Sequence, residues 1–173
     1  TRQPPYLVDW GKENVHTPNA EMKRLAKLMA EAGADVIIGT HSHTIQPLEW
    51  LKGKDGRETL CIYSLGNCIS SQLYMNQVLE DLVTLDLRVS EDGRKSVENV
   101  VAHPMICHYE TNEKVKDGQD FALREKIRLY LLEDYTEEQL QQHIEGEREL
   151  YAKMHEIHDM GDFRIQLRRP VFK

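Results

Sequence analysis

The chain has 173 residues, a length that suits one domain or one domain with an appendage. Its 22 Lys and Arg residues against 29 Asp and Glu residues give a net charge of -7, which argues against a nucleic-acid-binding protein. The apolar content of 40% is enough for a hydrophobic core, and no apolar run reaches the ~18 residues that a membrane span needs. Because Thr1 is not Met and an apolar run follows almost at once, we interpret the sequence as part of a longer protein, so the lack of a targeting segment does not indicate its location.

A helix is predicted near the amino terminus. Thr17 is suited to cap its first turn, and the proline that follows is favoured at the first helical position. Gly33 is suited to end it. One apolar face is indicated by residues that recur at helical spacing, namely Met22, Leu25, Ala26 and Met29.

Short apolar runs at residues 6–8 and 36–38 predict strands on either side of this helix. Three consecutive apolar residues in the second run are typical of a strand buried on both faces, as in a parallel sheet. A strand–helix–strand unit brings the carboxyl ends of both strands to the same edge of the sheet. We therefore expect Asp9, which follows the first strand, to lie beside His41 and His43, which follow the second.

These strand-end loops are the leading candidate for a functional site. Open α/β sheets place their chemistry beyond the carboxyl ends of their strands, and neutral imidazole is the commonest metal ligand in proteins. His41 and His43 are therefore predicted metal ligands, with a solvated loop as the alternative. Asp9 is either a metal ligand or acid–base group, or a carboxylate that caps backbone amides.

The middle of the chain predicts further strands. Residues 45–51 and 59–63 flank an Asp-Gly turn and suit a hairpin, and Asn67 after the second strand is either a ligand-binding amide or a turn former. Residues 82–89 alternate as a strand with one wet face, and residues 97–102 return antiparallel and end at His103.

Three cysteines, Cys61, Cys68 and Cys107, are too few for a disulfide framework, and we expect the first two to be small buried hydrophobic residues. His103 and His108 are single histidines near strand ends. Each is either structural or solvated, or lines the site.

A change in character after Tyr109 divides the chain into a predicted domain at residues 1–110 and a tail at residues 111–173. Residues 121–132 suit either a helix or a strand. From Thr136, the apolar pattern predicts a long amphipathic helix that packs on the domain, on a partner or on a second subunit, and a last short strand at residues 163–167.

Four motifs in a fixed order resemble the bacterial capsule-synthesis family that makes poly-γ-glutamate, which is itself similar to the calcineurin-like metallophosphoesterases. The resemblance covers roughly residues 5–140. The motifs are Asp-Trp-Gly-Lys-Glu at 9–13, the stretch from Gly33 to His43, Gln-Pro-Leu-Glu at 46–49, and Tyr-Ser-Leu-Gly-Asn at 63–67.

The resemblance implies an α/β fold, a two-sheet sandwich flanked by helices on both outer faces, of which this chain is the carboxyl-terminal half with a helical tail. It also implies a site for divalent metal ions (Mn, Mg, Ca or Zn), with two metal positions in the complete protein, of which Asp9, His41 and His43 are ligands. Glu13 and His103 are then the candidate catalytic proton carriers. The candidate substrate-binding residues are Trp10, Gly11, Gln46, Ser64 and Asn67.

This sequence departs from the family pattern at the site. Asp9 stands where the family usually has a histidine, Thr40 and Ser42 replace a common His and Pro, and Cys68 replaces a Phe. An oxygen ligand shifts metal preference toward Mg, Ca or Mn.

Three hypotheses follow: a capsule assembly or export factor with a metal-equipped cleft, an active metal-dependent phosphoesterase, or a structural module with a degenerate site. The resemblance implies as partners the amino-terminal half of the domain, an anionic polymer or phosphoester substrate and the capsule machinery, with a homo-oligomer as an alternative. It implies a location at the outer face of the bacterial membrane or the cell surface.

Overall fold

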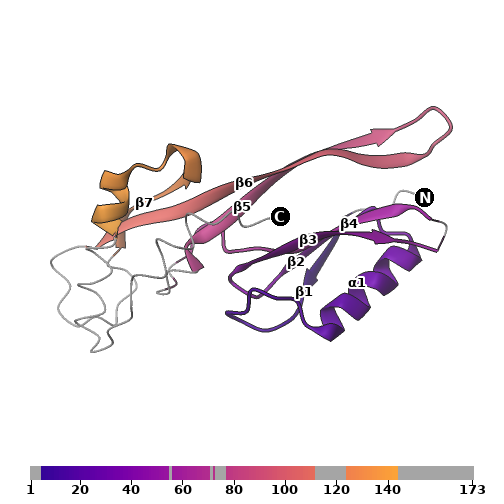
Figure 1. Ribbon diagram of the computed structural model, residues 1–173, viewed down its shortest axis with the longest axis horizontal. Coiled ribbons are helices and arrows are strands. Elements are labelled where there is room, and N and C mark those ends of the chain that lie inside the picture. The colour runs from indigo at the N-terminus through magenta and orange to yellow at the C-terminus, as the bar shows by residue number, and fades with distance from the viewer. Residues whose placement is uncertain (1–4, 55, 71, 73–76, 112–123, 144–173) are drawn as a thin grey trace. The chain divides into compact units, whose positions relative to one another are not determined.

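The computed structural model describes residues 5–54, 56–70, 72, 77–111 and 124–143 (Figure 1). The chain divides into two compact units, and each is described by itself. Unit 1 comprises Thr1–Gly66 and Asp81–His103, and unit 2 comprises Asn67–Glu80 and Pro104–Lys173. The division into a domain and a tail at residue 110 stays a prediction; that residue lies inside a strand.

Unit 1 contains a four-stranded sheet in the order β1-β2-β4-β3. Strand β1 (Tyr6–Asp9) pairs in parallel with β2 (Val36–Thr40), β2 pairs in parallel with β4 (Glu58–Leu65), and β3 (Ile45–Lys52) is antiparallel to β4. The strand–helix–strand unit and the hairpin predicted from the sequence are therefore confirmed. Val36 and Ile37 of β2 are both buried, as expected of a central strand.

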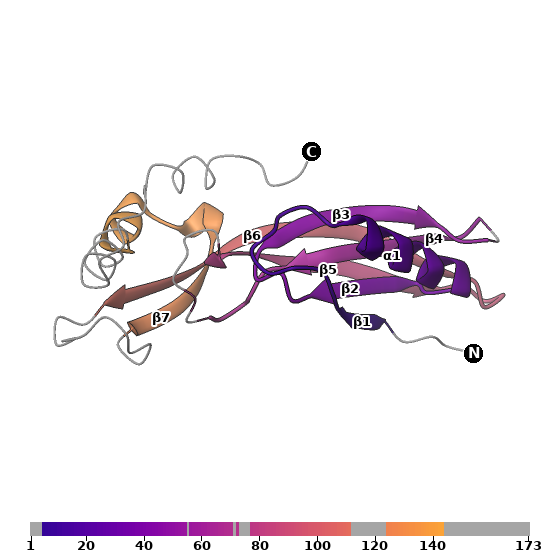
Figure 2. The same ribbon diagram turned by 90° about the horizontal axis from the view of Figure 1, so that it is seen from below.

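The predicted helix is α1 (Ala20–Ala32), which covers one face of this sheet (Figures 1 and 2). Its cap is Asn19, whose side chain accepts from the Met22 N–H at 2.9 Å, so the prediction that Thr17 caps it is wrong. Asn is at least as good a cap as Thr, and Asn19 lies two residues closer to the first apolar residue of the helix. Gly33 ends the helix with φ of 100°, as predicted.

A second, three-stranded sheet has the order β5-β6-β7. Its strands are β5 (Leu79–Val89), β6 (Lys95–Thr111) and β7 (Arg124–Leu131). The prediction that the returning strand ends at His103 is wrong, because β6 continues through Pro104. The stretch at 121–132 was predicted as either a helix or a strand, and its described residues 124–131 form the strand β7.

Beyond β7, the 3-10 turn η3 (Leu132–Asp134) leads into a helical segment at residues 137–143. Thr136 caps this segment: its Oγ1 accepts from the Gln139 N–H at 3.2 Å, and the Gln139 side chain accepts from the Thr136 N–H at 2.8 Å. The predicted helix therefore begins where expected. Its continuation past residue 143 and the predicted strand at 163–167 lie outside the described residues.

The fold class is α/β with two sheets, as predicted. Burial raises the pKa of the Cys61 thiol to about 12, consistent with a small hydrophobic residue, whereas Cys68 is exposed and the prediction that it is buried is wrong. Within the part of the chain that the structure describes, no helix is both long enough and apolar enough to cross a membrane.

Candidate functional site

The loops that follow β1 and β2 meet at one edge of the sheet. Asp9 is the residue opposite Thr40 in the parallel register, so the chain leaves both strands at the same level. His41 follows directly, and its Nδ1 lies 3.0 Å from Asp9 Oδ1. The predicted convergence of the first loop's carboxylate and the second loop's imidazole is confirmed.

A second carboxylate lies near the second imidazole. Glu13 Oε1 is 4.0 Å from His43 Nε2, and the rings of His41 and His43 have their centroids 6.4 Å apart at an interplanar angle of 30°. The His41 and His43 side chains are 39% and 32% exposed, so both imidazoles remain accessible to a ligand. We call these two contacts the carboxylate–imidazole pairs.

Both histidines have a backbone conformation that residues other than glycine rarely adopt. The φ angles of His41 and His43 are 97° and 58°, and Asn14 in the facing loop has φ of 61°. Each such residue costs about 1–3 kcal/mol, and strain of this kind concentrates at functional sites. Backbone hydrogen bonds join the two loops, from Trp10 N–H to Thr40 O at 3.4 Å and from Asn14 N–H to Ser42 O at 2.7 Å.

Trp10 and Gly11 pack between the strand-end loops and the core of unit 1. Trp10 is 6% exposed, stacks on Tyr63 with ring centroids 5.6 Å apart, and donates its indole N–H to the Tyr63 carbonyl at 3.0 Å. A Cβ at Gly39 would collide with that indole nitrogen and that carbonyl, and a Cβ at Gly11 would lie 2.6 Å from Met22 Sδ. The two glycines and the tryptophan therefore form a packed base for the loops.

A row of buried polar side chains alternates with the two histidines. Ser42, Thr44 and Gln46 are 0%, 0% and 2% exposed. The Val15 carbonyl accepts from Thr44 Oγ1 at 3.1 Å and from Gln46 Nε2 at 2.6 Å, while Gln46 Oε1 is buried without a hydrogen-bond partner in the described structure. An unmade hydrogen bond at a buried polar atom is costly, so this oxygen marks a place where a donor is expected.

The roles of Ser42 and Thr44 were missed by the sequence reasoning. The signal was the period of two: polar residues at 42, 44 and 46 alternate with the histidines at 41 and 43, so the polar set turns inward where the histidines remain partly exposed. Of the candidate binding residues, Ser64 lies opposite Gln46 in the β3–β4 register, is 1% exposed, and accepts from the Gly66 N–H at 3.3 Å.

Two candidate residues belong to other elements. Asn67 is in unit 2 and donates its side-chain amide to the Gln77 carbonyl at 3.1 Å. His103 lies on β6, with its Nε2 3.1 Å from Thr84 Oγ1 of β5. The structure therefore brings Asp9, Glu13, His41 and His43 together. It places His103, a candidate proton carrier, on β6.

The donor types suit a divalent cation, because carboxylate and imidazole are both common ligands. Among the described residues, however, no group of three or more His, Cys, Asp and Glu side chains is arranged to hold a metal ion. The contact of Asp9 with His41 Nδ1 leaves the His41 Nε2 available to a ligand, and carboxylates orient metal-binding histidines through such contacts. The site thus consists of two carboxylate–imidazole pairs on strained loops that are hydrogen-bonded to each other.

Comparison with known proteins identifies the class. Residues 6–72, which contain both strand-end loops and all of β1, α1, β2, β3 and β4, match the family model described as bacterial capsule synthesis protein PGA_cap. The resemblance drawn from the four motifs is therefore confirmed: residues 6–72 of this chain are similar to the capsule-synthesis family.

Two relatives make the match more specific. The chain is 35% identical over 94 residues to the PGA biosynthesis protein CapA of Bacillus subtilis (strain 168), a stretch that covers 54% of this chain and 23% of that protein. It is 35% identical over 79 residues to the capsule biosynthesis protein CapA of Bacillus anthracis, covering 46% and 18% respectively. The chain spans less than a quarter of the length of either relative.

Proposed function

We propose that this protein acts in the biosynthesis or export of a poly-γ-glutamate capsule. The observation that carries the proposal is the match of residues 6–72 to the capsule-synthesis family, together with two relatives whose names refer to PGA or capsule biosynthesis. The strand-end loops of unit 1, inside that match, are the candidate contact with the polymer. A net charge of -7 means that an anionic polymer needs a local positive feature in order to bind.

A divalent cation at the carboxylate–imidazole pairs would supply that feature. In this proposal His41 and His43 are nitrogen ligands, and Asp9 contributes an oxygen or holds the His41 ring. The support is the 3.0 Å contact between Asp9 and His41, the accessibility of both rings and the strain of their backbone. When bound, the ion would offset the carboxylates of Asp9 and Glu13 and attract carboxylates of the polymer.

Calorimetric titration of the purified protein tests both parts. Mn²⁺, Mg²⁺, Ca²⁺ and Zn²⁺ are titrated first, and then poly-γ-glutamate is titrated with and without the ion that binds. We expect stoichiometric metal binding and polymer binding that falls at least tenfold when the metal is chelated. His43→Ala and Asp9→Asn should lose metal affinity, whereas Glu91→Gln, which removes an exposed carboxylate in the β5–β6 turn, should not.

The other outcomes distinguish the alternatives. Turnover of a generic phosphodiester, lost in His43→Ala and not in Glu91→Gln, would identify the metal-dependent phosphoesterase, with Glu13 or His103 as its proton carrier. Polymer binding without any metal would keep the capsule function and reject the metal. No binding of metal or polymer would favour the structural module with a degenerate site.

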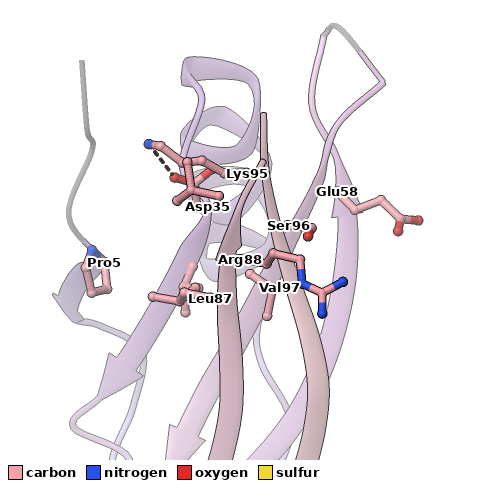
Figure 3. A pocket seen from close by; sticks show the side chains of 10 residues that line it. Pro5, Asp35, Glu58, Leu87, Arg88, Lys95, Ser96 and Val97 are labelled. Atoms are coloured by element: carbon pink, nitrogen blue, oxygen red, sulfur yellow. Dashed lines mark hydrogen bonds and ion pairs between the residues drawn. The ribbon is translucent and has the colours of Figure 1, made fainter. Parts of the chain in front are cut away.

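We also propose that the rest of the family's domain, its amino-terminal half, packs on unit 1. A cavity of about 460 Å³ is lined by apolar side chains that include Leu87 and Val97 and by charged ones (Figure 3). The charged side chains are Glu58, Arg88 and the Asp35–Lys95 ion pair, whose atoms lie 3.0 Å apart. Leu7 and Leu87 are 79% and 61% exposed. Exposed apolar surface next to a cavity is typical of a protein–protein contact.

Binding of that half, supplied as a separate polypeptide from a CapA relative, should protect β5 and β6 from amide exchange. Leu87→Asp should abolish the protection, and Ile127→Asp, an exposed apolar position in unit 2, should not. A concentration-dependent mass without added partner would indicate a homo-oligomer instead.

For location we propose the outer face of the bacterial membrane. This proposal rests on the similarity to the family, and cell fractionation tests it.

A further inference from the structure

Unit 2 buries two histidines among tyrosines. His108 and Tyr109 of β6 and His143 of the helical segment at 137–143 are 3%, 0% and 0% exposed. Tyr130 of β7 and Tyr135, next to η3, complete the group, which we call the aromatic–histidine cluster. Its ring centroids lie 5.7 Å apart for His108 and Tyr135, 5.9 Å for His108 and Tyr130, 5.6 Å for His108 and His143, and 4.5 Å for Tyr109 and His143.

Hydrogen bonds join both rings to their surroundings. The Tyr135 hydroxyl lies 2.7 Å from His108 Nδ1 and 3.2 Å from the Gln139 carbonyl, so it connects the His108 ring to the segment at 137–143. The Tyr109 N–H donates to His143 Nδ1 at 3.4 Å, so that nitrogen accepts and carries no proton. Both contacts are compatible with neutral rings.

The surroundings give a charged ring little compensation. Burial lowers the pKa of His108, and Arg128 and Lys126 on β7 lower it further, while Glu110 on the same strand opposes them. Glu110 Oε1 is 4.0 Å from His108 Nε2, but its Oε2 is held at 2.7 Å by Lys126 Nζ. Among the described residues, Tyr130 and Cys107 also interact with Tyr135 of the cluster, and their neutral forms add no countercharge.

Protonation of His143 as well as His108 would destabilise the cluster further. A proton on His143 must sit on Nδ1, where the Tyr109 N–H already points, so protonation breaks that hydrogen bond. Two imidazolium rings 5.6 Å apart would also repel each other in a fully buried setting. The packing of the helical segment at 137–143 on β6 therefore depends on both rings staying neutral.

We propose that the aromatic–histidine cluster is a pH-sensitive switch, in which protonation of His108 and His143 releases the helical segment at 137–143 from β6 and β7. The closed form excludes the two protons, whereas the released segment and strand expose both rings to water. An exposed histidine binds a proton below about pH 6.5, so the open form gains on acidification. This switch is independent of the loops of unit 1 and of the capsule function proposed for them.

The size of the effect follows from proton linkage. Each histidine that is protonated only in the open form raises the opening equilibrium up to tenfold per pH unit below about 6.5. Two such rings predict an increase of about 100-fold between pH 7.5 and 5.5. One ring alone predicts about tenfold.

Amide hydrogen exchange of the full chain, followed by mass spectrometry and corrected for the intrinsic pH dependence, measures this opening. Protection of peptides that cover 137–143 and 104–111 should fall about 100-fold from pH 7.5 to 5.5, by the same linkage. Peptides from β2 and β4 in unit 1 should change little. Whole-chain unfolding is a poorer readout, because burial raises the pKa of Glu80 to about 8 and of Asp81 to about 6, which stabilises the fold on acidification.

The variant H108Q/H143Q keeps amide groups for the same hydrogen bonds and cannot titrate, so its exchange should be independent of pH. The control His103→Gln, on the hairpin in unit 1, should keep the wild-type dependence. An NMR titration of the wild-type ring protons gives a second reading that needs no variant: His108 should titrate below an exposed histidine. Unchanged protection down to pH 5.0 in the wild type, or an equal fall in the double variant, would overturn the switch.

Discussion

Two regions of this molecule use histidine in opposite ways. In unit 1, His41 and His43 are about one third exposed, lie beside the carboxylates of Asp9 and Glu13, and have positive φ angles. In unit 2, His108 and His143 are buried among tyrosines. An imidazole beside a carboxylate in partial solvent is suited to bind a cation or carry a proton, whereas one among phenol rings is suited to stay neutral and pack.

The difference teaches that the element, and not the residue type, decides the role. His41 and His43 follow a buried parallel strand, where the chain must turn at the sheet edge and exposes its side chains. His108 lies near the carboxyl end of β6, opposite Arg128 of β7, and its ring contacts Tyr130, Tyr135 and His143, which cover it. The next three predictions separate the two regions, in order of expected effect.

Gly39→Ala should have the largest effect and should act on unit 1. The new Cβ would collide with the Trp10 indole and the Tyr63 carbonyl, neither of which can move without breaking the hydrogen bond between them. We expect a loss of about 3 kcal/mol in the free energy of unfolding. Urea denaturation followed by tryptophan fluorescence measures it, since Trp10 and Trp50 are both in unit 1.

The matched control is Gly93→Ala in the turn between β5 and β6. Its φ is 82°, but a Cβ there meets nothing within 4 Å, so only backbone strain of about 1 kcal/mol is expected. Equal losses in the two variants would show that the close approach at Gly39 is unimportant.

A pair of truncations compares the two kinds of histidine directly. His143→Ala removes a fully buried ring and leaves the Tyr109 N–H without that acceptor, which should cost about 2 kcal/mol. His43→Ala removes a partly exposed ring and should cost less than about 0.5 kcal/mol in the free energy of unfolding. The backbone strain at this residue, whose φ is 58°, remains because alanine keeps the Cβ. Denaturant-dependent amide exchange, read in β6 for the first variant and in β2 for the second, checks both. A larger loss for His43→Ala would remove the contrast.

The smallest effect is expected from Glu80→Gln, at a buried carboxyl of unit 2. Burial raises the pKa of Glu80 from 4.5 to about 8, so the folded state keeps a proton that the unfolded state releases above about pH 4.5. Stability is therefore lost as the pH rises toward 8, the reverse of the loss on acidification expected from the histidines. Urea midpoints at pH 5, 6.5 and 8 should decline less in Glu80→Gln than in wild type, with Glu91→Gln as an unaffected control.

Much of unit 1 could be predicted because its elements carry strong local signals. The apolar runs of β1 and β2, the helical spacing from Met22 and the Gly33 stop each agree with the parallel sheet. Local signals failed where two residues competed for the same role or where a neighbour decided. Asn19 displaced Thr17 as the helix cap, and Pro104 did not end β6 because partners on both sides continue the sheet.

Only the part of the site that follows from the sheet topology could be predicted from the sequence. Parallel pairing of β1 and β2 was enough to place Asp9 beside His41. The buried state of Trp10, Gln46 and Ser64 was not predictable, because it depends on contacts with Tyr63, Val15 and Gly66 that are distant in sequence or set by loop conformation. The aromatic–histidine cluster was missed for the same reason, since its members come from three separate elements.

The hydrogen bonds from Trp10 to Thr40 and from Asn14 to Ser42 have one more consequence. They couple the two strand-end loops mechanically, so a ligand that draws in one loop displaces the other with it. Affinity changes caused by substitutions in the two loops will then fail to add, and the shortfall in a double-mutant cycle measures how rigidly the rim of the sheet moves as one piece.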